Sequence, residues 1–590
     1  MMRSRSLVLC FALGAVSALA LASNSARGQE HPTKSIVLIT IDTCRADALG
    51  CYGNADVFTP TMDRMASVGQ QFANLRADIP LTLPAHCSLM TGLSLQRHRI
   101  RSNADRKLAG DIPLLAQLLR DKGYDTGAVI SGLPLTFGCG LQKGFRIYDD
   151  HLDTLSGDGA LERCADSTCR AALRLADQLT PPYFLWVHFY DVHAPYEAPM
   201  IVSSYDSSPY LNEVQWVDLC LGRLVRQLQS SSPTSLIIAI TGDHGEDLWQ
   251  HGEATHGVYL YDSVLTVPGL IMQSPPLIKG GICDRHVSLQ VFSSTVLDAL
   301  DPRPPAGVAQ SRCKPDIQYI ETTYPQEKYR WSALSGVVCD PYKFVGGGHA
   351  ELYHLRSDPG EKRNYLKWLR IINVALPSPA ANIGWTGRIH QANQSAPPID
   401  EHVLASLRSL GYAATSTKDD GNGSDPRDMR SVLRLSEDAS RAIFAGEFQT
   451  AFEVLTAALQ RDPSNPVLLN DYGLVCQRVG RFQDAIRAFE RCLEHDPENS
   501  RYWNNLGISL KAVNRLPAAI QAYSRSVFFD PNFAAGHYNL AVAYLAAGNS
   551  HQAKLAFSQS IALDPNFQAA RDALILLTSD GTIDEQPEHE

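Results

Sequence analysis

The sequence predicts an α/β domain with a mostly parallel sheet sandwiched by helices, followed by an all-α solenoid of repeated helix pairs. Two observations predict this architecture. Between residues 33 and 366, apolar runs typical of buried strands alternate with helical patterns. In the C-terminal part, an Asp-Pro pair recurs every 34 residues, at Asp462, Asp496, Asp530 and Asp564. A chain of 590 residues has room for about two to four domains, which agrees with this division.

The first predicted element is an export signal. Arg3 and Arg5 precede an apolar run over residues 7–22, which ends in the small residues Ala20 and Ala22. A basic start, a short apolar run and small residues at the exit are typical of a signal peptide, which we assign to residues 1–28. We therefore expect a secreted or periplasmic protein. An uncleaved N-terminal anchor is the alternative, although the run is shorter than the ~20 residues of a spanning helix.

The second element is the sheet of the α/β domain. Apolar runs at Ser35–Ile41, Thr126–Ile130, Tyr183–Phe189 and Leu236–Thr241 predict buried strands, and the pattern of Ile112–Leu119 predicts one of the helices between them. In such sheets ligands bind beyond the carboxyl ends of the strands. The polar residues at those ends are therefore the first candidates for a functional site.

Asp42 directly follows the first strand, and Asp243 and His244 follow the strand at 236–241. Two carboxylates and an imidazole are suitable ligands for one divalent cation, with the imidazole favouring Zn or Mn and leaving Ca possible. Thr82 lies just before Pro84, which suits the first position of a helix. The N–H groups and dipole at a helix start favour an anionic ester, and a metal can activate a threonine hydroxyl as a nucleophile. A plain helix cap is the simpler alternative for Thr82.

Five segments together resemble the sulfatase family of the alkaline phosphatase superfamily. They are IDTCRADALGCYG around Asp42, the motif Thr82–Gly92, HFYDVHAPYEAP at 188–199, GDHGEDLWQHGEATHG from Gly242, and DPYKF…ELYHLRSDPGEKRN at 340–364. They occur in the family's order across residues 33–366. The resemblance implies the alkaline-phosphatase/sulfatase-like fold, a metal site and hydrolysis of an anionic ester.

The sequence also departs from the sulfatase pattern. Thr82 stands where a sulfatase has the Cys or Ser that becomes formylglycine, and His86 stands where it has Arg. Threonine cannot be converted, so no formylglycine is expected. His244 stands where sulfatases usually have Asn, and His256 stands where many sulfatases have Lys. Thr43 stands where sulfatases commonly have a second metal-binding Asp. Thr82 and His244 resemble the phosphodiesterase and phosphoethanolamine-transferase branch, and all of these departures argue against sulfate-ester hydrolysis, which implies phosphate mono- or diesters rather than sulfate esters.

The resemblance implies roles for several side chains. The implied metal ligands are Asp42, Thr82, Asp243 and His244. The implied catalytic groups are a nucleophile and three histidines that bind the anion or protonate the leaving group: Thr82, His86, His193 and His256. Asn103 is a candidate for a hydrogen bond to the substrate. Asp191 and His188 are candidates for a second metal site.

The C-terminal repeats have further columns in the same period. They are a turn column of Gly446, Gly480, Asn514 and Gly548, and a small-residue column of Ala451, Ala485, Ala519 and Ala553. About four such units over residues 431–578 resemble tetratricopeptide repeats. Stacked helix pairs form a concave groove, which predicts a protein or peptide partner, with dimerisation or a spacer role as the alternative. Residues 367–430 are predicted to be a linker with a short helix near 400–411.

Charge narrows the range of partners. The chain carries 52 Lys and Arg against 62 Asp and Glu, and six of the acidic residues lie from Asp572 onward without any Lys or Arg. A net charge of -10 argues against nucleic acid as a partner, and residues 579–590 are predicted to be a solvated acidic tail.

The leading prediction is an exported, metal-dependent hydrolase of a small-molecule, glycan-linked or lipid-linked anionic ester. A phosphoethanolamine- or phosphoglycerol-type transferase and a non-catalytic repeat scaffold on a degenerate domain are the alternatives.

Overall fold

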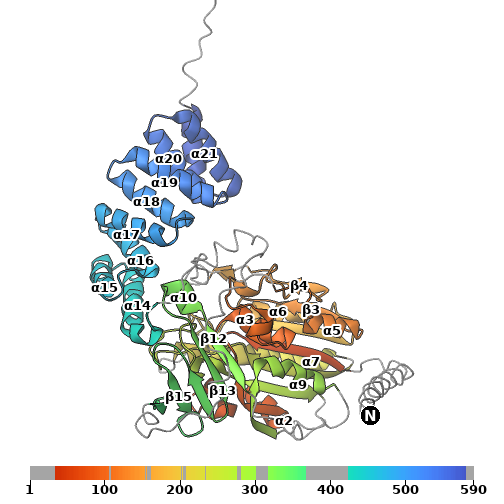
Figure 1. The fold of residues 1–590 in the computed structure, drawn as a ribbon. Helices are drawn as coiled ribbons and strands as arrows, with labels where there is room; N and C mark the ends of the chain where they lie inside the picture. Colours follow the sequence, from red (N-terminus) through yellow and green to blue (C-terminus); the bar gives the residue numbers. More distant parts are fainter. Residues whose placement is uncertain are drawn as a thin grey trace, which may run out of the picture.

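The computed structural model describes residues 34–104, 108–152, 154–155, 161–200, 202, 208–232, 234–274, 281–300, 317–366 and 423–579. The predicted signal peptide, the short helix near 400–411 and all but the first residue of the acidic tail lie outside these residues. Figure 1 shows an α/β body and a helical arm that extends from one side of it. No helix within the described residues combines the length and the apolar character needed to cross a bilayer.

The α/β body is built on a nine-stranded sheet in which most pairings around the centre are parallel. The strand order is β11-β2-β10-β8-β1-β7-β3-β4, with β9 paired to β2. The central strands β1, β7, β8, β3 and β4 are all parallel to their neighbours in this group, whereas β10 runs antiparallel to β8 and β2. Their bounds are β1 Lys34–Ile41, β2 Gln70–Arg76, β3 Asp125–Val129, β4 Ile147–Asp149, β7 Tyr183–Phe189, β8 Ser235–Gly242, β9 Thr266–Val267, β10 Gly269–Ser274 and β11 Gly281–Ser288. The predicted mostly parallel sheet is confirmed.

Helices cover both faces of this sheet, as the sequence predicts. Helices α3 (Thr82–Thr91), α5 (Leu115–Asp121) and α9 (Leu289–Asp298) share one buried cluster with Ile36 and Leu38 of β1. Helices α2 (Pro60–Val68), α6 (Ala165–Ala176) and α7 (Pro209–Ser231) share the other cluster with Val37, Ile39 and Ile41. Because successive strand residues point to opposite faces, Thr40 and Asp42 belong on the face covered by α3.

A second, four-stranded antiparallel sheet follows the main one. It has the order β12-β13-β14-β15, with bounds Gln318–Thr322, Leu334–Cys339, Tyr342–Val345 and Glu351–His354. The fully buried Lys343 of β14 joins it to the body, because its Nζ donates to Asp262 Oδ1 at 2.8 Å, to Leu260 O at 2.9 Å, and pairs with Glu361 Oε1 at 2.5 Å. These contacts hold the second sheet against residues 260–262 of the α/β body.

The helical arm consists of paired helices in the predicted 34-residue period. The pairs are α14 Arg430–Phe444 with α15 Phe448–Arg461, α16 Pro466–Arg478 with α17 Phe482–His495, α18 Ser500–Ala512 with α19 Leu516–Phe529, and α20 Ala534–Ala546 with α21 Ser550–Leu563, followed by α22 Gln568–Ser579. Each second helix ends at the Asp of an Asp-Pro pair. Gly446, Gly480, Asn514 and Gly548 have φ of 75°, 78°, 59° and 76°, which explains the Gly and Asn turn column. The predicted all-α solenoid is confirmed.

The arm is joined to the body by residues that the sequence assigned to the linker. Pro426–Met429 form a short 3-10 helix, η4, capped by Asp425, which accepts from the Arg427 backbone N–H. The buried Arg427 guanidinium pairs with Glu351 at 3.1 Å, and Arg430 donates to Tyr261 Oη at 2.7 Å. The polar composition of this stretch therefore reflects buried ion pairs at a joint rather than a flexible tether.

Candidate functional site

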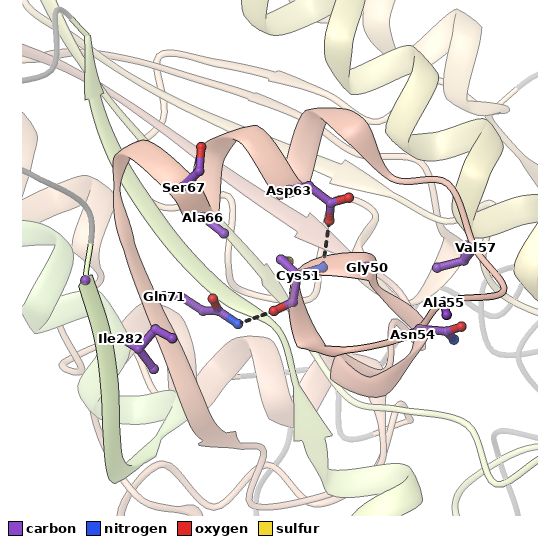
Figure 2. A pocket seen from close by; sticks show the side chains of 11 residues that line it. Gly50, Cys51, Asn54, Ala55, Val57, Asp63, Ala66, Ser67, Gln71 and Ile282 are labelled. Carbon is purple, nitrogen blue, oxygen red and sulfur yellow. Dashed lines mark hydrogen bonds between the residues drawn. The ribbon is translucent and has the colours of Figure 1, made fainter.

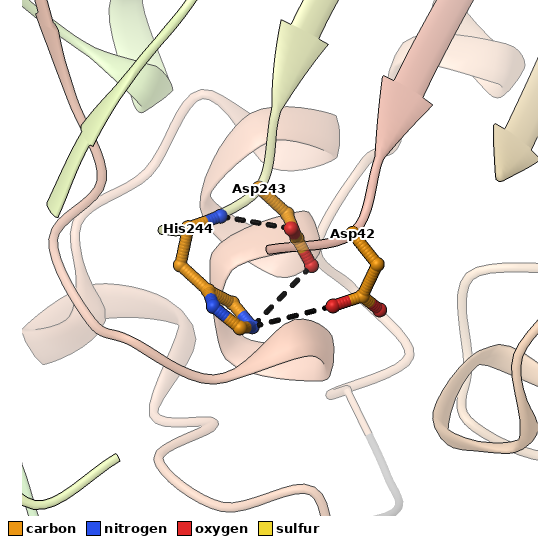
Figure 3. A group of neighbouring side chains, drawn as sticks. All are labelled: Asp42, Asp243 and His244. Carbon is orange, nitrogen blue, oxygen red and sulfur yellow. Dashed lines mark hydrogen bonds and ion pairs between the residues drawn. The ribbon is translucent and has the colours of Figure 1, made fainter. Parts of the chain in front are cut away.

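Three predicted metal ligands meet at the carboxyl ends of β1 and β8. These strands are adjacent and parallel, with Ile41 paired to Gly242, so Asp42 and Asp243 follow at the same edge of the sheet. Asp42, Asp243 and His244 are fully buried, and one ligand atom from each lies within 4.8 Å of the others. Figure 3 shows the two carboxylates and the imidazole turned toward one another.

The hydrogen bonds around these residues leave one acceptor free on each. Asp243 Oδ1 accepts from the backbone N–H of Thr43 at 3.2 Å and of His244 at 2.8 Å, and His244 Nδ1 donates to Gly245 O at 3.1 Å. Asp42 Oδ1, Asp243 Oδ2 and His244 Nε2 are buried without a hydrogen-bond partner. His244 Nε2 lies 3.7 Å from both carboxylate oxygens. Buried acceptors that face one another are costly, and a cation between them removes the cost, so these residues fit a divalent metal.

Ionisation behaviour agrees with this fit. Burial, with the charge of His256, lowers the pKa of His244 to about 3, so its imidazole is neutral and Nε2 carries a lone pair. Burial and the neighbouring Asp42 raise the pKa of Asp243 well above its ordinary value. Burial also opposes ionisation of Asp42, but contact with His188 and the field of the nearby histidines hold its pKa below the ordinary range. A bound cation would stabilise both carboxylates in their ionised forms.

Thr82 lies beside this cluster at the start of α3. Its Oγ1 donates to Asp42 Oδ2 at 3.4 Å, and the side chain is fully buried. The sequence predicted a helix beginning at Pro84, but α3 begins at Thr82 and Pro84 is its third residue. Proline is tolerated there because the first N–H groups of a helix have no carbonyl partner within the helix. Thr82 therefore contributes its hydroxyl as part of the first helical turn.

Asn103 is placed next to Thr82 by a backbone contact. Its Oδ1 accepts from the N–H of Leu83 at 2.8 Å, which satisfies one of the free donors at the start of α3. Its Nδ2 is buried and has no hydrogen-bond partner. The predicted hydrogen bond of Asn103 to the substrate is consistent with this unpaired amide.

His86, predicted to bind the anion in place of Arg, is engaged inside the protein. Its Nδ1 donates to Thr82 O at 2.8 Å, and its Nε2 lies 3.0 Å from Thr40 Oγ1. Burial, with the charge of His188, lowers the pKa of His86 well below its ordinary value, so the ring is neutral. Because Nδ1 carries the proton, Nε2 accepts a hydrogen bond from the Thr40 hydroxyl. The structure thus brings His86 to Thr82 with both ring nitrogens already bonded.

The same hydroxyl fixes the orientation of His188, which lies at the end of β7. Trp186 Nε1 donates to Thr40 Oγ1 at 3.0 Å, and His188 Nδ1 lies 3.0 Å from the same oxygen. Because the single Thr40 hydroxyl proton is used in the hydrogen bond to His86, His188 Nδ1 must donate to Thr40 Oγ1. His188 Nε2 then faces Asp42 Oδ2 at 3.5 Å, with no other partner.

His193 and His256 lie together, next to His244. The His256 ring is 4.4 Å from that of His244 and 5.2 Å from that of His193. His193 stacks on Tyr190 at 4.5 Å, and its Nδ1 donates to Ala194 O at 2.7 Å. The two predicted catalytic histidines are therefore brought to one place.

Glu246 is a functional candidate that sequence reasoning missed. His256 Nδ1 forms a hydrogen bond with Glu246 Oε1 at 3.1 Å, and Tyr196 Oη donates to Glu246 Oε2 at 3.0 Å. Burial raises the pKa of Glu246 to about 8, and burial with the charge of His193 lowers the pKa of His256 to about 3. The pair therefore holds one proton near neutral pH. The sequence signal that could have identified Glu246 is its position in the GDHGE segment, three residues after Asp243.

The proposed second metal pair does not form a ligand group among the described residues. Asp191 Oδ1 accepts from the backbone N–H of Ala165 at 2.6 Å, at the start of α6, and burial raises the pKa of Asp191 to about 7. Asp42, Asp243 and His244 are the group of three suitable ligands found within the described part of the chain. His251 has a structural role, because its Nδ1 forms a hydrogen bond with Asp247 Oδ1 at 3.0 Å and its ring stacks on that of Tyr261 at 3.9 Å.

A hollow of about 620 Å³ lies elsewhere, between α2, β2 and β11 (Figure 2). Its polar groups bond within its walls, as the Cys51 N–H donates to Asp63 Oδ1 at 2.7 Å and Gln71 Nε2 donates to Cys51 O at 2.9 Å. None of the predicted site residues lines it.

Comparison with known proteins agrees with the geometry. Residues 34–302 match the sulfatase family model, and residues 442–512 and 534–567 match tetratricopeptide repeat models. A Delta 4,5-hexuronate-2-O-sulfatase of Bacteroides thetaiotaomicron is 23% identical over 430 residues, which cover 59% of this chain and 87% of the relative. An arylsulfatase of Clostridium perfringens is 39% identical over 64 residues, covering 11% of this chain and 13% of the relative. These matches confirm both resemblances seen in the sequence.

Solved structures of similar fold include a phosphonate monoester hydrolase of Agrobacterium radiobacter, at a TM-score of 0.47 and 19% identity over 64% of this chain and 96% of the other. A 2-O GAG sulfatase has a TM-score of 0.45 and 19% identity, covering 58% of this chain and 90% of the other.

Proposed function

Because the chain carries a sulfatase domain, which makes it an ester hydrolase of the alkaline phosphatase superfamily, followed by tetratricopeptide repeats, we propose that it hydrolyses anionic esters with a metal ion and with Thr82 as the nucleophile. The observation that carries this proposal is the Thr82 hydroxyl, held 3.4 Å from Asp42 Oδ2 at the edge of three unpaired buried ligand atoms. A threonine with only a capping role would not need such a set beside it.

Asp42, Asp243 and His244 would hold one divalent cation, with Thr82 beside them. The single imidazole favours Zn or Mn, and Ca is possible. When bound, such an ion supplies positive charge that stabilises the anionic ester and lowers the pKa of a nearby hydroxyl.

The other side chains have roles that follow from their hydrogen bonds. Thr82 Oγ attacks the ester's central atom, so that a bond forms to Oγ and the bond to the leaving oxygen breaks. Asp42 Oδ2 orients the hydroxyl and accepts its proton during the attack. The Glu246–His256 pair holds a proton that it can transfer to the leaving oxygen, and Asn103 Nδ2 donates to an oxygen of the anion. In the second step water attacks the ester on Thr82 and gives a proton to the Glu246–His256 pair, and Thr82 Oγ leaves and takes its proton back from Asp42.

Phosphate mono- or diesters are the proposed substrates. Threonine cannot be converted to formylglycine, the group through which sulfatases act, His244 is the residue type of the phosphoryl-transfer branch, and His256 stands where many sulfatases have Lys. Sulfate-ester hydrolysis is the second candidate, because the relative aligned over 430 residues is named a hexuronate sulfatase and points to a sulfated glycan. Residues 1–28 support an exported location, where glycan- and lipid-linked esters are accessible.

The test offers the purified, metal-supplemented protein an aryl phosphate, a bis-aryl phosphate and an aryl sulfate. Thr82→Ala should lower kcat on the preferred ester by at least about 100-fold, and Thr82→Ser should retain part of it. Thr91→Ala, at the far end of the same helix, is the matched control and should behave like the wild type.

Each outcome separates one alternative from the rest. Sulfate turnover that survives Thr82→Ala would overturn the nucleophile assignment. Turnover only in the presence of an added acceptor alcohol would identify a transferase. No turnover of any ester, with no metal retained, would identify a non-catalytic scaffold.

A further inference from the structure

Two cysteine side chains meet where α6 packs on α7. Cys169 lies in the middle of α6, and Cys220 lies in the middle of α7. Both are buried in the same apolar cluster, and both are free thiols in this structure. Cys169 Sγ donates to the backbone O of Cys220 at 3.4 Å, and the two thiols also form a hydrogen bond with each other. The two sulfur atoms are therefore neighbours in the fold, although their residues are 51 positions apart in the sequence.

The helix faces around these thiols suit the spacing that a disulfide requires. Ala165 and Ala172, about one turn before and after Cys169, are fully buried, and such small side chains let packed helices approach closely. Cα atoms lie about 2.3 Å from a helix axis, so facing Cα atoms of helices packed about 9–10 Å apart are roughly 4.5–5.5 Å from each other. A disulfide joins Cα atoms about 4.4–6.8 Å apart. A covalent bond between the two sulfur atoms is therefore compatible with this helix packing.

Arg223 makes the two thiols chemically different. Its Nη2 donates to Cys220 Sγ at 3.0 Å, and the guanidinium is held in place by Asp166 of α6 at 2.9 Å and by the Trp216 ring at 5.6 Å. The hydrogen bond from Cys169, together with Arg223, lowers the pKa of Cys220 below its ordinary value. The same hydrogen bond, together with burial, raises the pKa of Cys169. In a thiol–disulfide exchange, Cys220 is therefore the attacking thiolate and Cys169 the thiol that reacts second.

Arg223 also connects the buried pair to the surface. Its side chain is 47% exposed, whereas Cys220 is fully buried and Cys169 is 4% exposed. The sulfur of Cys220 thus lies one side chain beneath the surface, and a donor disulfide reaches it when Arg223 moves aside. The predicted signal peptide, residues 1–28, would direct the chain to a compartment in which disulfides persist.

We propose that Cys169 and Cys220 are the two halves of a disulfide that joins α6 to α7. The Cys220 thiolate attacks a donor disulfide, so that a bond forms from Cys220 Sγ to one donor sulfur and the other donor sulfur leaves as a thiolate. That thiolate takes the proton of Cys169, and Cys169 Sγ attacks Cys220 Sγ and releases the second donor sulfur, which takes up the proton that Cys220 had lost. Two cysteine thiols are oxidised, and one donor disulfide is reduced to two thiols.

The bond would support the site from the face of the sheet opposite to α3. Near the start of α7, the buried Tyr210 Oη donates to Thr43 O at 2.9 Å and accepts from the Arg45 N–H at 2.9 Å. Thr43 and Arg45 belong to the segment that directly follows Asp42. Because a disulfide acts mainly by restricting the unfolded chain, we expect its effect on stability and not on the chemistry of Thr82.

The first test maps disulfides in the full-length protein, purified without reductant and then incubated with oxidised glutathione. The protein is unfolded in N-ethylmaleimide, cleaved at arginine and at aspartate, and analysed by mass spectrometry. Cleavage at Asp166 separates Cys169 from Cys164, which is the nearest competing thiol in the sequence. We expect the Cys169 peptide to be linked to the Cys220 peptide, and the link to disappear with dithiothreitol. Two maleimide-labelled peptides, or a link from Cys169 to Cys164, would overturn the proposal.

The second test measures the consequence of the bond. Dithiothreitol should lower the thermal midpoint of the oxidised wild type by at least about 4 °C, and the double variant C169S/C220S should start at the lower midpoint and respond less to reductant. Cys164→Ser is the matched control and should behave like the wild type. If the double variant does not fold, the response of the wild type to reductant still decides the question.

An equal response of wild type and double variant to reductant, or no response of the wild type, would contradict a stabilising bond between α6 and α7. Neither test uses ester turnover, so this proposal and the proposed hydrolase activity fail separately.

Discussion

Replacing Thr40 by valine should damage the site although Thr40 touches neither the proposed metal ligands nor the substrate. The Thr40 hydroxyl is fully buried and bonds three ring nitrogens, Trp186 Nε1, His86 Nε2 and His188 Nδ1, each at 3.0 Å. Valine has nearly the same shape and removes only these bonds. His86 would then lose its proton donor, and His188 would lose the bond that directs Nε2 toward Asp42.

The magnitude follows from the groups left unpaired. Each buried polar group without a partner costs about 1–3 kcal/mol. Three of them predict a loss of roughly 3–6 kcal/mol in the free energy of unfolding, when some relaxation is allowed. The neighbouring strand provides a matched control, because Thr241 pairs with Thr40 across β1 and β8, is equally buried, and makes one bond, to Gly242 O at 2.9 Å. Thr241→Val should therefore cost about 1 kcal/mol.

Urea denaturation followed by tryptophan fluorescence measures both losses, and mass spectrometry of bound metal gives a second readout. We expect Thr40→Val to lose at least about 2 kcal/mol more than Thr241→Val and to retain less metal per chain at a fixed metal concentration. If the two variants lost equal stability and kept equal metal, the shared hydroxyl would have no special role and the assignment of a proton to His188 Nδ1 would be wrong.

Four further results are expected. Glu246→Gln keeps both hydrogen bonds but removes the shared proton, so kcat should fall roughly 10- to 100-fold with little change in KM, in steady-state kinetics. Burial raises the pKa of Asp78 to about 7 from 3.8, so its stabilising effect is complete below about pH 4 and is lost as pH rises through 7. Asp78→Asn should therefore gain up to about 4 kcal/mol relative to wild type between pH 4 and 8, measured by urea midpoints; a constant difference would contradict this. Lys343→Met should lose about 3–5 kcal/mol, because Glu361 is left without its buried partner and Asp262 is left with Arg76 alone, whereas the exposed Lys362→Met should stay within about 0.5 kcal/mol. Chelator treatment should lower the thermal midpoint and added Zn or Mn should restore it, while an unchanged midpoint would argue against a bound metal.

The sheet, the ligands and the repeats could be predicted because their signals are local. Apolar runs predicted the strands, and polar residues directly after two of them, Asp42 and Asp243, became neighbours once those strands paired. The 34-residue period predicted the solenoid, including the left-handed turn residues. In each case a short stretch of sequence contains the physical cause.

The joint between body and arm could not be predicted in this way. Residues 423–429 are polar and contain Gly and Pro, as a linker does. What orders them is the pairing of Arg427 with Glu351, 76 positions earlier, and of Arg430 with Tyr261. Composition describes a segment in isolation, whereas this segment is stabilised by partners distant in sequence.

Thr40 shows how strand geometry extends what a sequence can indicate about a site. In the run SIVLITI it is one polar residue among apolar ones, and β-propensity alone accounts for it. It precedes Asp42 by two positions, however, and residues two apart in a strand point to the same face. Thr241 precedes Asp243 and Trp186 precedes His188 by the same interval, so all three pairs belong on the face covered by α3. A polar residue two positions before a predicted ligand in a buried strand is therefore a candidate to orient the side chains of the site. Thr40 is such a residue, because its one hydroxyl forms hydrogen bonds with three ring nitrogens.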